Sequence, residues 1–158
     1  MTEFFLNNKK VKAKDDETIW TVAKREGIVL PHLCFADKPG YRADGNCRAC
    51  MVSIEGERVL AASCIRKPTE GMKVITNDER STKSRKMVLE LLVTDQPDRE
   101  TSHDPDSHFW NVASSVDVAK SRFDKREKTI VPCEDASHVA MSVNLDACIH
   151  CNLCVRAC

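Results

Sequence analysis

The sequence predicts an α+β protein with a small mixed sheet, a helical and irregular linker, and a short cysteine-rich module at its end. Three observations predict this class. Short β-like segments surround one short helix in the first 78 residues, a longer helix with periodic apolar residues follows, and cysteines cluster in two separate groups. We place the domain boundaries at residues 1–78, 79–142 and 143–158.

The first region contains most of the strand signals. Segments 4–6 and 9–14 flank a polar Asn-Asn pair, which predicts a β-hairpin. Asp15 or Asp16 can cap a short helix that ends at Gly27. This order suits a small mixed sheet of the β-grasp type. Three further strands are expected at residues 49–54, 58–62 and 72–76.

The middle region begins with the clearest helix of the chain. Asn77 or Asp78 can cap it, and it is expected to run to about Thr94. Its apolar residues are spaced to lie near one face: Met87, Val88, Leu91 and Leu92. Beyond it we expect a short helix, an irregular stretch and a short strand, at residues 109–118, 121–138 and 143–145.

Composition excludes several classes of protein. The chain has 24 basic and 24 acidic residues in 158, which gives no electrostatic reason to expect nucleic acid or an anionic membrane as partner. No apolar run is long enough for a membrane span, and the start has no secretory signal pattern. Nine cysteines, an odd count with clustered C-x2-C pairs, favour metal ligation in a reducing cytoplasm over disulfides.

The first cysteine group has the spacing C-x12-C-x2-C-x13-C, at Cys34, Cys47, Cys50 and Cys64. Four converging thiolates can bind a [2Fe–2S] cluster. Gly45 allows close backbone approach in the loop that would wrap this cluster, and backbone N–H groups there can bond to its sulfurs. A zinc site is the alternative, and Cys64 is the member that could instead be an ordinary buried residue.

The second group has the tighter spacing C-x2-C-x2-C-x3-C, at Cys148, Cys151, Cys154 and Cys158. This is the run of bacterial two-cluster ferredoxins, in which the fourth cysteine ligates the other cluster. We expect the first three on one [4Fe–4S] cubane and Cys158 on a second. The chain then supplies half of a two-cubane module, so we interpret it as the front part of a longer protein, with zinc again as the alternative.

A family resemblance follows from these residues. Segments 45–52, 62–64 and 84–86 resemble the start of the large iron–sulfur subunit of respiratory NADH dehydrogenase. The same family includes NAD-dependent hydrogenases and molybdenum or tungsten formate dehydrogenases that reduce NAD. Residues 143–158 resemble the two-cubane module of this family, and the resemblance covers roughly two thirds of the chain. It implies a β-grasp [2Fe–2S] ferredoxin-like domain followed by the first half of a two-[4Fe–4S] ferredoxin module.

One departure from the family is specific. Most members carry a His-x3-Cys-x2-Cys-x5-Cys segment after the long helix, which holds a further four-iron cluster. Here His103 is followed by Ser107, Trp110 and Val116 at the cysteine positions, so we expect no such cluster. In this feature, residues 102–110 look most like the catalytic (alpha) subunit of soluble NAD-dependent formate dehydrogenase. The remaining candidates are interpreted as loop or core residues: Trp20, His32, His103, His108, Trp110 and Cys133.

The resemblance implies an electron-transfer arm with no catalytic residue of its own. Formate would be oxidised at a molybdenum or tungsten bis-pterin downstream, and electrons would pass through the clusters to FMN and NAD on partner subunits. The implied partners are a flavin- and NAD-binding diaphorase subunit with its own iron–sulfur clusters and the rest of the catalytic subunit. The alternatives are the matching subunit of NADH dehydrogenase or of an NAD-linked hydrogenase, and a zinc-structured binding module.

Overall fold

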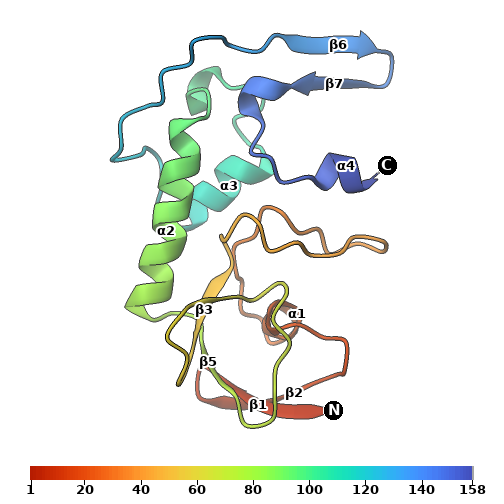
Figure 1. The fold of residues 1–158 in the computed structure, drawn as a ribbon, viewed down its shortest axis with the longest axis vertical. Coiled ribbons are helices and arrows are strands. Elements are labelled where there is room, and N and C mark those ends of the chain that lie inside the picture. Colours follow the sequence, from red (N-terminus) through yellow and green to blue (C-terminus); the bar gives the residue numbers. More distant parts are fainter. Residues whose placement is uncertain (158) are drawn as a thin grey trace.

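A five-stranded mixed sheet forms one end of the molecule in the computed structural model, which describes residues 1–157 (Figure 1). The strand order is β2-β1-β5-β3-β4; β1 and β5 run parallel, and the other neighbouring pairs run antiparallel. This is the predicted mixed sheet. Its strands are β1 (Thr2–Leu6), β2 (Lys9–Ala13), β3 (Met51–Ile54), β4 (Ala61–Ala62) and β5 (Lys73–Ile75).

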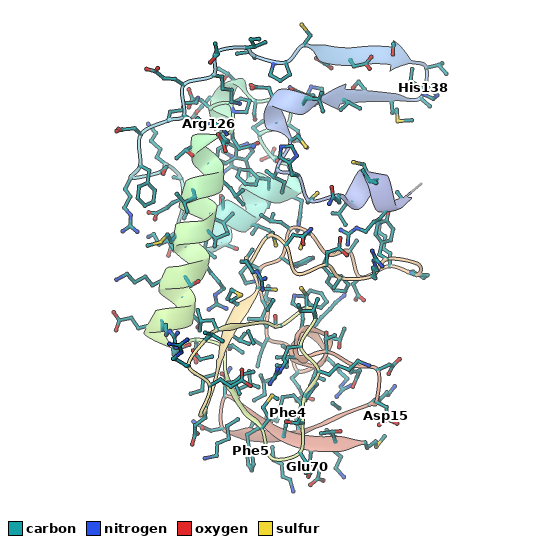
Figure 2. The ribbon with its side chains drawn as sticks, in the orientation of Figure 1. Phe4, Phe5, Asp15, Glu70, Arg126 and His138 are labelled. Carbon is teal, nitrogen blue, oxygen red and sulfur yellow. The ribbon has the colours of Figure 1, made fainter. Side chains whose placement is uncertain are left out.

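The β1–β2 hairpin forms where the sequence predicts it. Asn7 and Asn8 have φ angles of 49° and 68°, the left-handed pair that a two-residue hairpin turn of type I′ requires. Asparagine adopts this conformation at lower cost than most residues. Phe4, labelled in Figure 2, is fully buried, while its neighbour Phe5 lies on the partly exposed face. The alternation of buried and exposed residues therefore fixes which face of the sheet carries the core.

Helix α1 (Ile19–Arg25) packs against the sheet and begins later than expected. Its N-cap is Thr18, so the prediction that Asp15 or Asp16 caps this helix is wrong. Thr18 and Thr21 form a reciprocal capping box, in which each side chain accepts a hydrogen bond from the backbone N–H of the other residue. The aspartates lie in the preceding turn instead.

Helix α2 (Glu79–Thr94) follows Asp78 and presents a different face from the predicted one. Its buried residues are Ser81, Arg85, Leu89 and Glu90. The predicted apolar face is only partly covered, and Leu91 is 50% exposed. Polar residues can occupy the buried face because they have partners there: Arg85 donates to the Thr76 carbonyl at 2.5 Å. No helix within residues 1–157 is long and apolar enough to cross a membrane.

A second core lies where α2 crosses α3 (His108–Ser115). Phe109, Trp110 and Val112 of α3 pack there with Leu89 of α2 and with Leu33, which comes from the segment after α1. The expected short helix at 109–118 is therefore present with slightly different bounds. Because Leu33 and Ala49 lie in this second core while Phe35 and Cys50 lie in the sheet core, the cysteine-bearing segments run between the two cores.

The last part of the chain forms a separate hairpin and a short helix. The stretch predicted to be irregular contains β6 (Glu134–His138), which pairs with β7 (Met141–Asn144), so that prediction is wrong for residues 134–138. Figure 1 shows this hairpin at the end of the molecule opposite the main sheet, with α4 beside the loop that follows α1. The remaining elements are η1 (Arg99–Thr101), η2 (Leu145–Ala147) and α4 (Leu153–Ala157).

Candidate metal centre

The first four cysteines meet beside the sheet, although they come from three segments. Cys34 follows α1, Cys47 and Cys50 lie just before β3, and Cys64 follows β4. Cys34, Cys50 and Cys64 are almost completely buried, with exposed fractions of 1%, 1% and 2%. The structure therefore brings the four predicted ligands together as free thiols in one largely buried place.

Hydrogen bonds around Ser63 bring the last cysteine back to the loop. The Ser63 N–H and hydroxyl both donate to the Cys50 carbonyl, at 3.2 and 2.7 Å. The Ser63 carbonyl accepts from the Trp20 N–H at 3.0 Å, which ties this turn to α1. The β3–β4 pairing of Met51 with Ala62 continues the same register. Cys64 is therefore placed by the sheet itself, and it is not an isolated buried residue.

The side chains of the four cysteines interact with one another. Cys34 interacts with both Cys47 and Cys64, and Cys64 also interacts with Cys50, so the four side chains form one continuous group. The Cys47 N–H also donates to Cys34 Sγ at 3.4 Å. Within residues 1–157, no three or more His, Cys, Asp or Glu side chains gather in the way that a single metal ion requires. Two cysteines for each of two irons is the arrangement that four cysteines provide to a two-iron cluster.

The electrostatics of the four thiols fit a cationic centre. Hydrogen bonds from Cys47 and Cys64 lower the pKa of Cys34 far below that of a free thiol. A hydrogen bond from Cys64 lowers the pKa of Cys50 to about 6, despite its burial. The pKa values of Cys47 and Cys64 are raised, chiefly because each thiol donates a hydrogen bond to Cys34 and also because both are partly withdrawn from solvent. Only metal ions with positive charge can stabilise all four groups as thiolates in so small a volume.

Backbone conformation around the C-x2-C turn is unusual at two positions. Gly45 has a φ of 67°, and a Cβ built on it would lie 2.8 Å from Ile65 Cδ1. Glycine is therefore needed both for its conformation and for the close approach of the Ile65 side chain. Arg48, between the two cysteines of the turn, has a φ of 58°. These conformations bend the loop so that Cys47 and Cys50 both lie beside the sulfurs of Cys34 and Cys64.

The second cysteine group has a looser environment in the part of the chain that the structure describes. Cys148 and Cys154 are exposed and Cys151 is partly buried, while Cys158 lies outside the described residues. The His150 N–H donates to Cys148 Sγ at 3.4 Å, and His150 and Asn152 have φ angles of 52° and 58°. The loop thus turns tightly around its first sulfur, but its role in holding a cubane stays a prediction.

The other candidates have structural partners. Trp20 and Trp110 are buried, and the Trp20 indole N–H donates to the Leu30 carbonyl at 3.1 Å. His108 Nε2 lies 2.7 Å from the His32 carbonyl oxygen, and the rings of these two histidines are in contact. The exposed Cys133 lies immediately before β6.

Two basic residues near the cysteines were missed at the level of sequence. Arg85 lies on the buried face of α2, and its charge interacts with those of Asp78 and Cys50. Arg156, between the last two cysteines of the second group, reaches the backbone of Cys34 at 2.7 Å. The sequence around Arg85 gives no sign that it is buried near the cysteines. Arg156 could have been singled out, because it is a charged residue inside the C-x3-C spacing of Cys154 and Cys158.

A small mixed sheet with four free cysteines gathered beside it is typical of two-iron ferredoxin-like domains. The family model described as a 2Fe-2S iron-sulfur cluster binding domain matches residues 1–79, and the chain belongs to this family. This confirms the predicted ferredoxin-like fold and the two-iron cluster of the first region. The second, four-iron module is not covered by this match and remains a prediction.

The relatives are oxidoreductase subunits much longer than this chain. The chain is 28% identical to the NADP-reducing hydrogenase subunit HndD of Solidesulfovibrio fructosivorans, over 100% of this chain and 28% of that protein. It is 29% identical to the 78 kDa subunit of mitochondrial NADH-ubiquinone oxidoreductase of Candida albicans, over 98% of this chain and 21% of that protein. The chain therefore spans about a quarter of the length of these relatives.

A solved structure shares the fold over nearly the whole chain. A chain of the NAD⁺-reducing [NiFe]-hydrogenase in the H₂-reduced state superposes with a TM-score of 0.83 and is 27% identical, covering 99% of this chain and 65% of that chain. These similarities are to subunits of the kinds of complex that the sequence resemblance implied. They fit the alternatives, NADH dehydrogenase and NAD-linked hydrogenase, better than formate dehydrogenase, which no comparison shows.

Proposed function

We propose that this chain is the iron–sulfur electron-transfer segment of an NAD-linked, multi-subunit oxidoreductase. The observation that carries the proposal is the convergence of Cys34, Cys47, Cys50 and Cys64, three of them almost completely buried, in a domain that matches the two-iron cluster binding family. The similarity to subunits of NADH dehydrogenase and of NAD-reducing hydrogenase supports the same function. A segment of this kind makes and breaks no substrate bonds; it positions redox centres and sets their potentials.

Each part of the first site has a task in this proposal. Cys34, Cys47, Cys50 and Cys64 would together hold the [2Fe–2S] cluster. The bound cluster supplies a site that accepts and releases one electron. The Cys47 N–H donates to the Cys34 sulfur and so disperses its negative charge, and the sheet core keeps water from Cys50 and Cys64.

The second cysteine group extends this path. We assign Cys148, Cys151 and Cys154 to one [4Fe–4S] cluster and Cys158 to a second, on the strength of their ferredoxin spacing. Partner subunits with flavin and NAD would exchange electrons with this segment, and the substrate site would lie on another part of the complex. The abundance of cysteine ligands suits a reducing cytoplasm as its compartment.

A formate dehydrogenase is the second candidate for the whole complex. The observation in its favour is the segment around α3, where Ser107, Trp110 and Val116 replace the cysteines of a further cluster. Trp110 is buried in the second core there, so this segment has a packing role in place of a ligand role. Formate oxidation would then require a molybdenum or tungsten pterin elsewhere in the complex.

Metal analysis of two serine variants tests the proposal. The full-length protein is purified without oxygen, and its iron, sulfide and zinc contents are measured beside those of Cys47→Ser and Cys133→Ser. Cys47→Ser should lose about two irons per chain, because an oxygen ligand matches iron–sulfide chemistry poorly. Cys133→Ser, a change of the same size at an exposed cysteine, should keep the wild-type content. Equal iron in both variants, or zinc in place of iron, would refute the assignment.

The compound that reduces the clusters shows which kind of complex this chain belongs to. The complete complex is exposed separately to formate, hydrogen and NADH while the visible absorbance of its clusters is recorded. Bleaching by NADH alone indicates a respiratory NADH dehydrogenase. Bleaching by hydrogen as well indicates a hydrogenase, and bleaching by formate indicates a formate dehydrogenase. Failure of all three to bleach the clusters would contradict an NAD-linked oxidoreductase.

A further inference from the structure

Arg156 is a charged residue that the protein has largely withdrawn from water. Its side chain is only 12% exposed, although α4, which carries it, is a short helix at the surface (Figure 1). A guanidinium group has five N–H bonds, and here its nitrogens make four hydrogen bonds and one ion pair with surrounding oxygens. The acceptors are the Asn152 carbonyl at 3.1 Å, the Arg42 carbonyl at 2.7 Å, Asp44 Oδ2 at 3.1 Å, the Cys34 carbonyl at 2.7 Å and the Cys151 carbonyl at 2.9 Å.

The acceptors show that Arg156 does more than stabilise its own helix. Asn152 and Cys151 belong to the second cysteine loop, whereas Cys34, Arg42 and Asp44 belong to the loop that carries the two-iron site. Three of the five interactions therefore cross between the two loops. A planar donor fork of this geometry fits several oxygens at once, which lysine cannot do.

One nitrogen of Arg156 joins the two ligand sets directly. Nη2 donates to the carbonyl oxygen of Cys34 and to that of Cys151. Each of these carbonyls belongs to a cysteine that we assign as a ligand, one on each cluster. The hydrogen-bonded path from one ligand residue to the other thus contains a single side-chain nitrogen.

Asp44 anchors the cation on the side of the two-iron loop. Its side chain is 20% exposed, and its other basic neighbour, Arg42, is 85% exposed and 3.4 Å away. Of the two arginines beside Asp44, Arg156 is much less exposed to solvent than Arg42. Loss of the Arg156 side chain would leave a mostly buried carboxylate and four backbone carbonyls of the two loops without these donors, which should loosen both loops.

An apolar cavity lies between the same two loops. It has a volume of about 380 Å³ and is lined by Asn46, Cys47, Val88, Leu91, Leu92, Ile149, His150 and Cys151. Because it holds residues from both cysteine loops and from α2, the two loops do not fill the space between them with tightly packed side chains. Hydrogen bonds from Arg156 are therefore a principal connection between them.

We propose that Arg156 is a positioning residue for electron transfer, a clamp that holds the second cysteine loop at a fixed distance from the two-iron site and places a permanent positive charge beside it. This rests on the proposed function. Transfer between the two sites moves one electron, so that one is oxidised as the other is reduced. No bond forms or breaks, and the guanidinium keeps its proton throughout.

Two consequences follow from this arrangement. The distance between the sites depends on the four hydrogen bonds and the ion pair of this guanidinium, so Arg156→Lys and Arg156→Gln should both increase its variation. The potential of the two-iron site depends on the charge, because its reduced form carries one more negative charge. Arg156→Gln should therefore lower that potential, and Arg156→Lys should leave it near the wild-type value.

The first test is amide hydrogen exchange in the full-length protein, purified anaerobically. Amides of residues 34–46 and 148–152 should exchange about tenfold faster in both Arg156 variants, because charged hydrogen bonds that hold the loops are lost. Arg80→Gln is the matched control, since Arg80 is exposed and its hydrogen-bond partner is the Arg58 carbonyl, which belongs to neither loop. Wild-type exchange in both Arg156 variants would overturn the clamp.

The second test uses EPR on the same proteins. Redox titration should give a lower two-iron potential in Arg156→Gln alone, and the spin–spin coupling between the reduced sites should weaken in both Arg156 variants. An unchanged potential in Arg156→Gln together with unchanged coupling would refute the proposal. If wild-type protein binds no iron, the proposed function fails instead, and hydrogen exchange of the iron-free protein still decides whether Arg156 joins the loops.

Asp44→Asn provides a second perturbation in case the Arg156 variants do not fold. It keeps the shape of the side chain and removes the charge that pairs with Arg156. Exchange of residues 42–46 should become several-fold faster while the core of the sheet is unchanged. Identical exchange in Asp44→Asn and wild type would contradict the anchoring role and with it the clamp.

Discussion

Replacement of Gly45 by alanine should distort the loop that presents Cys47. Gly45 has a φ of 67°, which costs an alanine about 1–2 kcal/mol. The new Cβ would also lie 2.8 Å from Ile65 Cδ1, so the Ile65 side chain must move. Ile65 is 47% exposed and can rotate, at about 0.5–1.5 kcal/mol for an unfavourable rotamer. The total expected destabilisation is about 2–3 kcal/mol.

Gly40→Ala is the matched control for this change. Gly40 lies in the same loop with a φ of 85°, but nothing lies within 4 Å of a Cβ built on it. Gly40→Ala should lower the free energy of unfolding only by the cost of a left-handed backbone conformation for alanine, about 1–2 kcal/mol. When residue 65 is alanine, Gly45→Ala should destabilise the protein by the same amount as Gly40→Ala, because the close contact with Ile65 Cδ1 no longer exists.

The assay is urea unfolding of the anaerobically purified proteins, followed by circular dichroism and by the visible absorbance of the cluster. The expected order of stability is wild type, then Gly40→Ala, then Gly45→Ala, with the Gly45→Ala cost reduced when Ile65 is alanine. If Gly40→Ala and Gly45→Ala are equally destabilised and the Ile65 background makes no difference, the close contact between Gly45 and Ile65 does not contribute.

Two further substitutions test other parts of the structure. Thr18→Ala removes one half of the capping box of α1 and should cost about 1 kcal/mol in urea unfolding, with unchanged iron content; no loss of stability would show that another residue caps this helix. His108→Ala removes the hydrogen bond to the His32 carbonyl and should also cost about 1 kcal/mol, again without loss of iron. Iron loss in His108→Ala would mean that the segment around α3 takes part in a metal site.

The sequence predicted the elements that depend on local signals. The Asn7-Asn8 pair adopts the left-handed turn conformations that a short hairpin requires, and the hairpin forms there. The first four cysteines, far apart in sequence, could be grouped because their spacing and the strands around them are characteristic of a ferredoxin loop. In both cases a recognisable residue pattern in the sequence, a turn pair or a cysteine spacing, is sufficient for the prediction.

Elements that depend on tertiary partners were predicted less well. The buried face of α2 holds Arg85 and Ser81, because backbone carbonyls and Asp78 provide hydrogen bonds that no periodicity of apolar residues can reveal. The cap of α1 is Thr18 although two aspartates precede it, because the helix must enter the sheet core at Ile19. Strand β6 is exposed and polar, so it carries no apolar alternation.

The contacts of Arg156 show why the rest of the site could not be predicted. Its acceptors at Cys34 and Arg42 are 122 and 114 residues away in sequence, and both are backbone carbonyls. A backbone carbonyl is present at every residue, so sequence gives no sign of which one an arginine will meet. Only the packing of α4 against the loop after α1 brings them together.

Spin quantitation by EPR tests the central claim most directly. Purified without oxygen and reduced with increasing amounts of dithionite, the protein should show a signal from the two-iron site that integrates to about one unpaired electron per chain, as expected for one electron on a [2Fe–2S] cluster. The signal should disappear in Cys47→Ser and persist in Cys133→Ser. A colourless protein with one zinc per chain and no EPR signal would contradict the electron-transfer function.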